Sequence, residues 1–160
     1  MTEAVLSLGA NVGDRQGFLT AAVDQLGETV RAVSSIYRTP PWGGVEQEDF
    51  LNVVVLVADT AVDDPRVWLD RCQALERSAG RQRAVRWGPR TLDADVVTVG
   101  ELVVEDPVLT LPHPLAHQRA FVLLPWSEID PFAELVGYGP IADLLEQVDL
   151  TGICKLGRLP

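Results

Sequence analysis

The chain has 160 residues, of which 47% are hydrophobic, and a formal net charge of −10 at pH 7. This length and apolar content suit one buried core, so we expect a single domain over residues 1–160. No apolar run reaches the ~18 residues of a membrane span, and the first residues lack a signal-peptide pattern. The net negative charge argues against a nucleic-acid partner. Cys72 and Cys154 follow no metal-binding spacing, which favours reduced thiols in a cytoplasmic protein.

The first hundred residues alternate between strand and helix patterns. An apolar run predicts a strand over 4–8, and after a turn over 9–14 Asp14 is the expected N-cap of a helix ending near Leu26. The elements expected next are a strand over 29–38, a loop over 39–46, a central strand over 51–58, a helix that starts at Asp63 or Asp64 with Pro65 just inside and ends at Gly80, and a strand over 92–99. This β-α-β-β-α-β order predicts an α+β fold of the ferredoxin-like type, with two helices packed on an antiparallel sheet.

The remaining residues show a less regular pattern. Short strands are expected over 102–104 and 109–111, and the segment 121–126 is apolar without a clear period. A rigid turn over 112–114, a helical turn over 115–120 and a last helix over 141–147 complete the prediction. No second apolar stripe is evident that would cover a partner copy, so we expect a monomer.

Two carboxylates open the strand expected over 92–99. Asp93 and Asp95 are spaced i and i+2, so they share one face of that strand. Two exposed carboxylates on an edge strand are the simpler interpretation, but Asp is depleted in strands and this one is otherwise apolar. Because adjacent carboxylates repel unless a cation lies between them, we predict Mg²⁺ at this position.

Basic residues are concentrated just before this strand. Within a chain of negative net charge, such a cluster favours a small, highly charged anion such as a nucleoside triphosphate. Those on the expected helix also suit an ordinary solvated face, whereas those in the loop after Gly80 do not. The cluster contains seven of the 13 basic residues, namely Arg66, Arg71, Arg77, Arg81, Arg83, Arg86 and Arg90.

Three weaker signals leave alternatives open. The segment 9–15 lacks the lysine and hydroxyl residue of a phosphate-binding loop, so a tight turn is the better interpretation. His113, held between two prolines, suits a functional or a structural role equally, whereas His117 is expected to be solvated. Phe50 and Asn52 could present an aromatic platform and an amide to a flat heterocycle. The residues alone favour Phe50 in the core and Asn52 as a turn cap.

Several segments, in this order, make the chain resemble the 6-hydroxymethyl-7,8-dihydropterin pyrophosphokinase family of folate biosynthesis. The resemblance covers nearly the whole chain, and its family's fold is ferredoxin-like with additional elements. The most specific segment is Arg86 to Val97. The supporting ones are Leu8-Gly9-Ala10-Asn11, Tyr37-Arg38-Thr39-Pro40-Pro41, Phe50-Leu51-Asn52, Leu111-Pro112-His113-Pro114 and Arg119-Ala120-Phe121.

The resemblance implies a role for each matching residue. Asp93 and Asp95 would hold two Mg²⁺ ions that bridge the phosphates of ATP, while Arg81 and Arg90 would stabilise the transferring group. Phe50 and Phe121 would sandwich the pterin. The residues implied at the nucleotide are Glu76, Arg83, Trp87, His113 and Arg119, and those implied at the pterin edge are Thr39, Pro40, Trp42 and Asn52.

The implied reaction is attack of the pterin hydroxymethyl oxygen on the β-phosphorus of ATP, with release of AMP. Such a transfer needs positioning and neutralisation of charge more than a side-chain base. Two alternatives stay open: a ferredoxin-like module that binds ATP or a pterin without catalysis, and a nucleotide-dependent transferase with another acceptor.

Overall fold

The computed structural model describes residues 2–40, 48–80 and 91–160. In its first part the elements are β1 (Thr2–Ala10), α1 (Arg15–Leu26), β2 (Val30–Val33), β3 (Ile36–Thr39), β4 (Phe50–Asp59), α2 (Arg66–Ser78) and β5 (Asp93–Val99). The second part adds β6 (Val104–Glu105), β7 (Thr110–Leu111), a short 3-10 turn η2 (Ala116–Gln118), α3 (Ala120–Ile129), β8 (Glu134–Leu135), β9 (Gly139–Pro140), α4 (Ile141–Leu145) and β10 (Cys154–Gly157). A further 3-10 turn, η1 (Gly27–Thr29), links α1 to β2.

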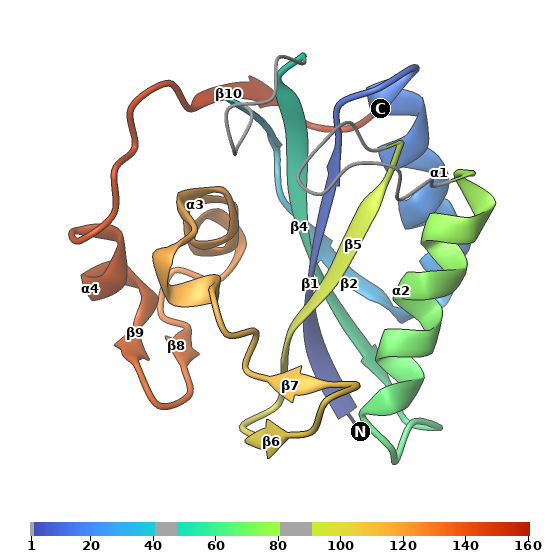
Figure 1. The fold of residues 1–160 in the computed structure, drawn as a ribbon, viewed down its shortest axis with the longest axis vertical. Coiled ribbons are helices and arrows are strands. Elements are labelled where there is room, and N and C mark those ends of the chain that lie inside the picture. The colour runs from blue at the N-terminus through green and yellow to red at the C-terminus, as the bar shows by residue number, and fades with distance from the viewer. Residues whose placement is uncertain (1, 41–47, 81–90) are drawn as a thin grey trace.

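The main sheet is antiparallel, with strand order β10-β3-β4-β1-β5 and β2 pairing along β4 (Figure 1). The predicted ferredoxin-like arrangement is therefore confirmed: β1, α1, β2 with β3, β4, α2 and β5 follow the expected order. The strand expected over 51–58 is indeed central, because β4 pairs with β1, β2 and β3.

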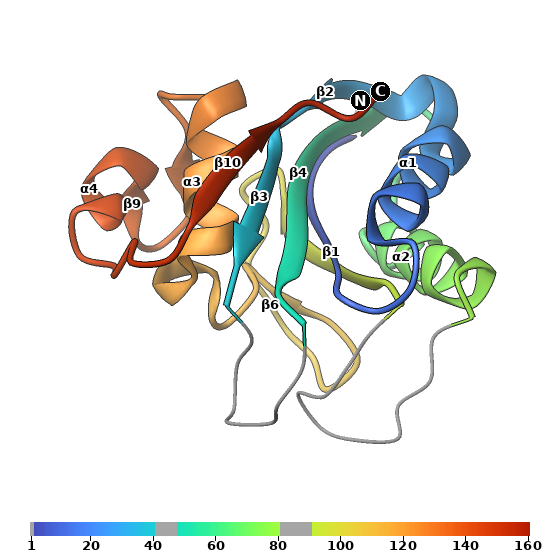
Figure 2. The same cartoon turned by 90° about the horizontal axis from the view of Figure 1, so that it is seen from above.

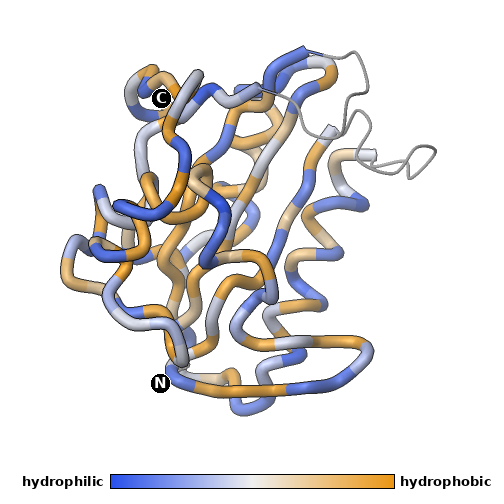
Figure 3. The backbone as a smooth tube through the Cα atoms, turned by 60° about the vertical axis from the view of Figure 1, so that its left-hand side comes forward, coloured by the Kyte–Doolittle hydropathy of each residue, from blue (hydrophilic) through white to orange (hydrophobic). Residues whose placement is uncertain are grey.

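Helices cover both faces of this sheet (Figure 2). Side chains alternate along each strand, so Val53 and Val55 of β4 join the core with α1 and α2, while Val54 joins a second core with α3 and α4. Figure 3 shows many orange (apolar) stretches along the tube, and the strand residues that form both cores are buried. The face that α3 covers matters most below, and we call it the α3 face.

The segment predicted as one strand over 29–38 is two strands, and this correction affects the site. The chain is interrupted at Ser34 and Ser35, where the Ser34 amide donates to the Val54 carbonyl at 2.9 Å and the Ser34 hydroxyl accepts from the Val54 amide at 2.9 Å. A hydroxyl that takes over a ladder hydrogen bond allows the backbone to turn while β2 and β3 both stay on β4. Residue types that favour strands on both sides conceal this break in the sequence.

Other predictions after residue 100 need smaller corrections. The apolar segment 121–126 lies within helix α3 and has Pro125 inside it, and the last helix ends at Leu145 rather than 147. The short strands are β6 and β7, displaced slightly from 102–104 and 109–111. The strands β8, β9 and β10 were not predicted, since pairs of two residues and a strand with a half-exposed pattern carry little signal.

The helix starts agree with the predicted signals. Asp14 caps α1 by accepting the Gly17 amide at 3.0 Å, and Asp64 accepts the Arg66 amide at 3.0 Å at the start of α2. Cys72 and Cys154 are free thiols, as expected. Within the described ranges, no helix is long and apolar enough to cross a membrane.

Candidate active site

A row of directly opposed residues crosses the sheet from β3 to β5. Tyr37 on β3 lies opposite Asn52 on β4, Asn52 opposite Gly9 on β1, and Gly9 opposite Asp93 on β5. Opposed residues of antiparallel strands project to the same face, and two residues further along Ser7 lies between Val54 and Asp95. Because Val54 packs against α3, the whole row lies on the α3 face. The sheet thus brings the Asn52 amide and the Asp93 and Asp95 carboxylates, all predicted site groups, onto one face.

Asn52 is buried at the centre of this row, with 3% of its surface exposed. Its amide nitrogen donates to the Thr39 hydroxyl at 2.8 Å and to the Tyr37 carbonyl at 3.2 Å. The interpretation of Asn52 as a turn cap is therefore wrong: it joins two strands. Thr39 itself lies opposite Phe50, which is half-buried on the same face and not part of either core cluster.

Gly9 leaves space in the row between Asn52 and Asp93. A Cβ atom at this position would lie 2.9 Å from Asn52 Oδ1 and 3.6 Å from Phe50 Cδ1. The first distance is shorter than van der Waals contact, so no larger residue fits without moving the Asn52 side chain. The sequence signal for Gly9 was a turn, and its role beside Asn52 appears only from the register.

Asp93 and Asp95 lie half-buried on either side of Ala94, whose side chain points to the opposite core. Their shared face, predicted from the i, i+2 spacing, is confirmed by the strand register. Glu76 of α2 is buried and its Oε2 accepts the Ala94 amide at 3.0 Å. Glu76 therefore fixes the backbone between the two carboxylates.

Arg119 and Phe121 reach the same face from the start of α3. The Arg119 Nη1 atom lies 3.6 Å from Asp95 Oδ2, and the Arg119 Cζ atom lies 5.4 Å from the centre of the Phe121 ring. A guanidinium between a carboxylate and an aromatic ring is held by ion pairing and by a cation–π contact. The chain thus places a cation next to the carboxylate pair.

His113 is a further member of this cluster. Its amide donates to the Val97 carbonyl at 2.8 Å, which ties the turn to β5. Burial, followed by the charge of Arg119, lowers the pKa of His113 to about 4, while Asp93 acts in the opposite direction. His113 Nδ1 accepts the Leu115 amide at 3.2 Å, so the neutral ring carries its proton on Nε2 and can donate there.

Not every predicted residue joins the cluster. His117, expected to be solvated, stacks on Tyr138 with ring centroids 4.2 Å apart, so that expectation was wrong. Pro40 ends the described part of the loop after β3 and packs beside Gly152, where an added Cβ would lie 2.9 Å from Pro40 Cγ. The predicted residues Trp42, Arg81, Arg83, Trp87 and Arg90 lie outside the described residues, as does Arg86.

The donor set of this site suits Mg²⁺. Among the described residues no cluster of three or more His, Cys, Asp or Glu side chains could enclose a metal ion. Mg²⁺ needs no such cluster, because it is commonly held by one or two carboxylates together with water and substrate phosphates. Asp93 and Asp95, on one face with Arg119 as a neighbouring cation, could supply those carboxylates.

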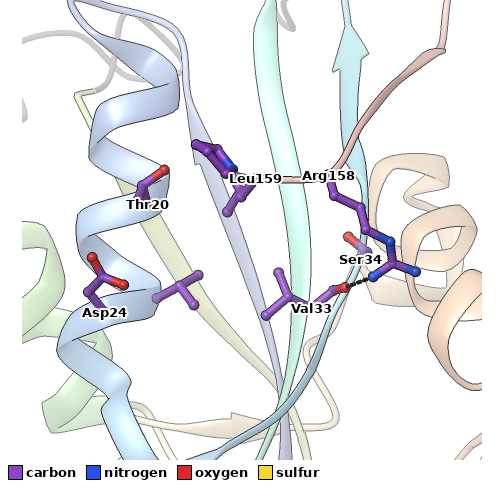
Figure 4. A pocket seen from close by; sticks show the side chains of 8 residues that line it. Thr20, Asp24, Val33, Ser34, Arg158 and Leu159 are labelled. Atoms are coloured by element: carbon purple, nitrogen blue, oxygen red, sulfur yellow. Dashed lines mark hydrogen bonds between the residues drawn. The ribbon is translucent and has the colours of Figure 1, made fainter.

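A cavity of about 170 Å³ lies on the other side of the sheet, between α1 and the last residues of the chain. Figure 4 shows Thr20 and Asp24 of α1 facing Leu159 and Arg158, whose Nη1 donates to the Val33 carbonyl at 3.3 Å. None of the predicted site residues lines it. This cavity is therefore separate from the candidate site on the α3 face.

Comparison with known proteins agrees with the sequence resemblance. The family model described as 7,8-dihydro-6-hydroxymethylpterin-pyrophosphokinase (HPPK) matches residues 5–131. A Mycobacterium tuberculosis protein named 2-amino-4-hydroxy-6-hydroxymethyldihydropteridine pyrophosphokinase is 48% identical over 161 residues, which cover 93% of this chain and 85% of that protein. A Methylorubrum extorquens protein of the same name is 42% identical over 157 residues, covering 96% of this chain and 98% of that one.

Solved structures agree at the level of the fold. Wild-type Plasmodium falciparum HPPK-DHPS superposes with a TM-score of 0.66 at 15% identity, over 91% of this chain and 44% of that one. A structure described as HPPK-DHPS in complex with substrates gives a TM-score of 0.70 at 13% identity, also over 91% of this chain and 44% of that one. The chain thus spans less than half the length of these proteins.

Proposed function

We propose that this chain, which belongs to the 7,8-dihydro-6-hydroxymethylpterin-pyrophosphokinase family, transfers the β,γ-diphosphate of ATP to the hydroxymethyl group of 6-hydroxymethyl-7,8-dihydropterin in folate biosynthesis. The name and high identity of its relatives support this activity. The observation that carries the proposal is the row Asn52–Gly9–Asp93. In this row Gly9, which has no side chain, lies between the buried Asn52 amide and the Asp93 carboxylate. A pterin bound at the Asn52 amide would therefore lie next to a diphosphate bound near Asp93.

The acceptor is proposed to lie between Phe50 of β4 and Phe121 of α3. Two aromatic rings from different layers suit a flat heterocycle, since stacked rings interact favourably across their faces. Asn52 would bond the edge of the pterin with its amide group, whose Oδ1 faces the space at Gly9. The loop residues proposed to complete this edge are Thr39, Pro40 and Trp42.

ATP is proposed to bind on the β5 side of the row. Asp93 and Asp95 would hold two Mg²⁺ ions, which when bound neutralise the triphosphate and align it for attack. Arg119, already 3.6 Å from Asp95, would exchange this carboxylate for nucleotide oxygens. Arg81 and Arg90 are proposed to stabilise the transferring group, and Glu76, Arg83, Trp87 and His113 to serve the nucleotide, Glu76 by holding β5.

The chemical step follows from these positions. The hydroxymethyl oxygen of the pterin bonds to the β-phosphorus, the bond from that phosphorus to the α,β-bridging oxygen breaks, and AMP leaves with the electron pair. The hydroxyl proton passes to solvent. Phosphoryl-type transfer depends mainly on alignment and on stabilising charge, which Arg119, the loop arginines and the neutral His113 Nε2–H would supply.

The proposal includes a monomeric cytoplasmic enzyme with one pyrophosphokinase domain over residues 1–160. The single domain is supported by the main sheet, which both cores share. Light scattering on the purified chain, with the mass of one copy expected, tests the monomer.

Turnover with Mg²⁺, ATP and 6-hydroxymethyl-7,8-dihydropterin, with AMP and ADP separated, tests the activity. Pterin-dependent AMP is the expected result. ADP would indicate a kinase that transfers a single phosphoryl group. Bound ATP without any product would favour the alternative of a non-catalytic ATP- or pterin-binding module, and AMP formed only with another acceptor would indicate a different transferase.

A further inference from the structure

Glu128, in the last turn of α3, is bound to three groups of β3 and its preceding break. Its Oε1 accepts the Ser35 amide at 2.8 Å and the Tyr37 hydroxyl at 3.1 Å, and its Oε2 accepts the Ser35 hydroxyl at 2.7 Å. Lys155 of β10 lies 3.4 Å from the same Oε2. One side chain thus joins a helix of the α3 layer to two strands at the edge of the sheet.

These hydrogen bonds replace partners that the sheet does not provide. Ser35 falls at the break between β2 and β3, where its amide would otherwise be buried without an acceptor. The Tyr37 side chain is buried with 4% exposure, and burial together with Glu128 raises its pKa to about 12, so its hydroxyl stays protonated and donates. The carboxylate therefore determines where β3 lies relative to α3.

Of the two elements that Glu128 joins, α3 carries one side of the proposed acceptor pocket, and β3 holds Asn52 of β4 on the other side. Phe121 and Arg119 lie at the start of α3, and Glu128 lies seven residues after Phe121, or ~10 Å along a helix that rises 1.5 Å per residue. On the sheet side, the Tyr37 carbonyl and the Thr39 hydroxyl both accept from Asn52. A displacement of β3 relative to α3 would change the distance between Phe121 and the Asn52 side of the pocket.

We propose that Glu128 is a positioning residue, which sets the spacing between Phe121 on α3 and the Asn52–Phe50 side of the acceptor pocket. This inference rests on the proposed function, because the pocket is defined by it. Glu128 does not contact substrate; it acts through Ser35 and Tyr37. The competing account is that Glu128 only stabilises the fold. A positioning role predicts a change in the KM for the pterin alone, whereas a purely structural role predicts equal changes in the KM for the pterin and for ATP.

Steady-state kinetics of Glu128→Gln, with pterin and ATP varied separately, tests this role. The amide has the shape of the carboxylate but is neutral and carries an NH2 group in place of one oxygen. At the Oε2 position the Ser35 hydroxyl therefore loses its charged acceptor, and the ion pair with Lys155 is lost. We expect the KM for the pterin to rise roughly tenfold, which corresponds to the loss of one charged hydrogen bond, while the KM for ATP stays within about twofold of wild type. Equal changes in both constants, or no change in either, would overturn the proposal.

Asp59→Asn is the matched control. Asp59 is the last residue of β4, where its carboxylate accepts the Ala61 amide at 2.8 Å and pairs with Arg71 at 2.8 Å. It binds a backbone amide and a cation as Glu128 does, but at the end of β4 opposite to Phe50. Both KM values should be unchanged in this variant. A rise in the pterin KM here equal to that of Glu128→Gln would mean that any loss of stability produces the effect.

Ser35→Ala provides a milder second variant in case Glu128→Gln folds poorly. It removes one donor to Glu128 and keeps the backbone hydrogen bond, so the pterin KM should rise in the same direction by a smaller factor. In the double variant the two effects should be less than additive, because both remove the same contact. Full additivity would contradict the shared mechanism.

The two proposals fail in different ways. A wild-type protein that forms no pterin-dependent AMP rejects the proposed function. A wild-type protein that turns over, together with a Glu128→Gln variant whose pterin and ATP constants change equally, rejects only the positioning role. Fluorescence titration with 6-hydroxymethylpterin in the presence of Mg²⁺ and a nonhydrolysable ATP analogue gives the same comparison at equilibrium.

Discussion

Gly9 and Asn52 are opposed in the ladder between β1 and β4, and a Cβ at Gly9 would lie 2.9 Å from Asn52 Oδ1. This distance makes the absence of a side chain at Gly9 a condition for the observed Asn52 rotamer. The amide nitrogen of Asn52 is already committed to Thr39 and Tyr37. The Oδ1 atom and the space above Gly9 thus form the part of the row that a ligand can use.

Gly9→Ala should impair the use of the acceptor more than that of ATP. The added methyl either fills the space beside Asn52 or moves the amide away from its two partners, and the loss of one such hydrogen bond corresponds to roughly a tenfold weaker interaction. We expect the pterin KM to rise by at least this factor while nucleotide binding is retained. A variant with wild-type kinetics for both substrates would show that the space at Gly9 is not used.

Asp93→Asn and Asp95→Asn should each lower turnover by roughly a hundredfold or more, because charge stabilisation at the transferring group is lost. Each should also abolish the rise in melting temperature that Mg²⁺ with a nonhydrolysable ATP analogue produces in the wild type. Asp106→Asn serves as the control, since Asp106 lies between β6 and β7, outside the candidate site, and pairs with Arg66 at 3.1 Å. Wild-type turnover in the Asp93 variant would refute the metal assignment.

Glu76→Ala should destabilise the protein. It removes the buried acceptor of the Ala94 amide, and an unsatisfied buried donor costs about 1–3 kcal/mol. Urea denaturation should show this decrease in the free energy of unfolding, whereas Arg77→Ala, the exposed neighbour on α2, should change it little. Turnover should fall as well, because β5 carries both Asp93 and Asp95. A destabilised variant with full activity would show that Glu76 does not contribute to the site.

The stability of the metal-free protein should rise with pH between about 4 and 6.5, in part because of His113. Within this window the unfolded chain binds a proton at His113 and the folded chain does not, so acidification favours unfolding. Above the window the contribution is constant. In His113→Asn, whose Oδ1 can still accept the Leu115 amide, the pH dependence of the free energy of unfolding in EDTA should be smaller. An identical pH profile in both proteins would contradict the lowered pKa.

Much of the fold could be predicted from local signals. Asp14 and Asp64 mark the starts of helices, and the i, i+2 spacing of Asp93 and Asp95 fixes their common face without knowledge of the sheet. The break at Ser34 and Ser35 could not be predicted, because it depends on hydroxyl hydrogen bonds to Val54 and Glu128. Helix α3 was missed since it is apolar on most sides, having neighbours in both the sheet and α4.

The same limit applies to the candidate site. Residue types and family resemblance indicated Asp93, Asn52 and Phe121, each on a separate segment. Their arrangement in one row with Gly9 depends on the register of β1 against two neighbours. Glu128 carried no recognisable motif, because its partners lie 91 and 93 residues away in the sequence.

The α3 face has two parts. In one part Val5, Val54 and Val97 pack against Leu123 and Trp126. The other part, around the row Asn52–Gly9–Asp93, carries the candidate site. The opposite face carries the larger core and, of the predicted site residues that the structure describes, only Glu76. Directed evolution should therefore find the two faces unequal: substitutions between the sheet and α1 or α2 can raise thermostability while leaving specificity unaltered. Substitutions under α3 that gain stability should often change substrate preference as well.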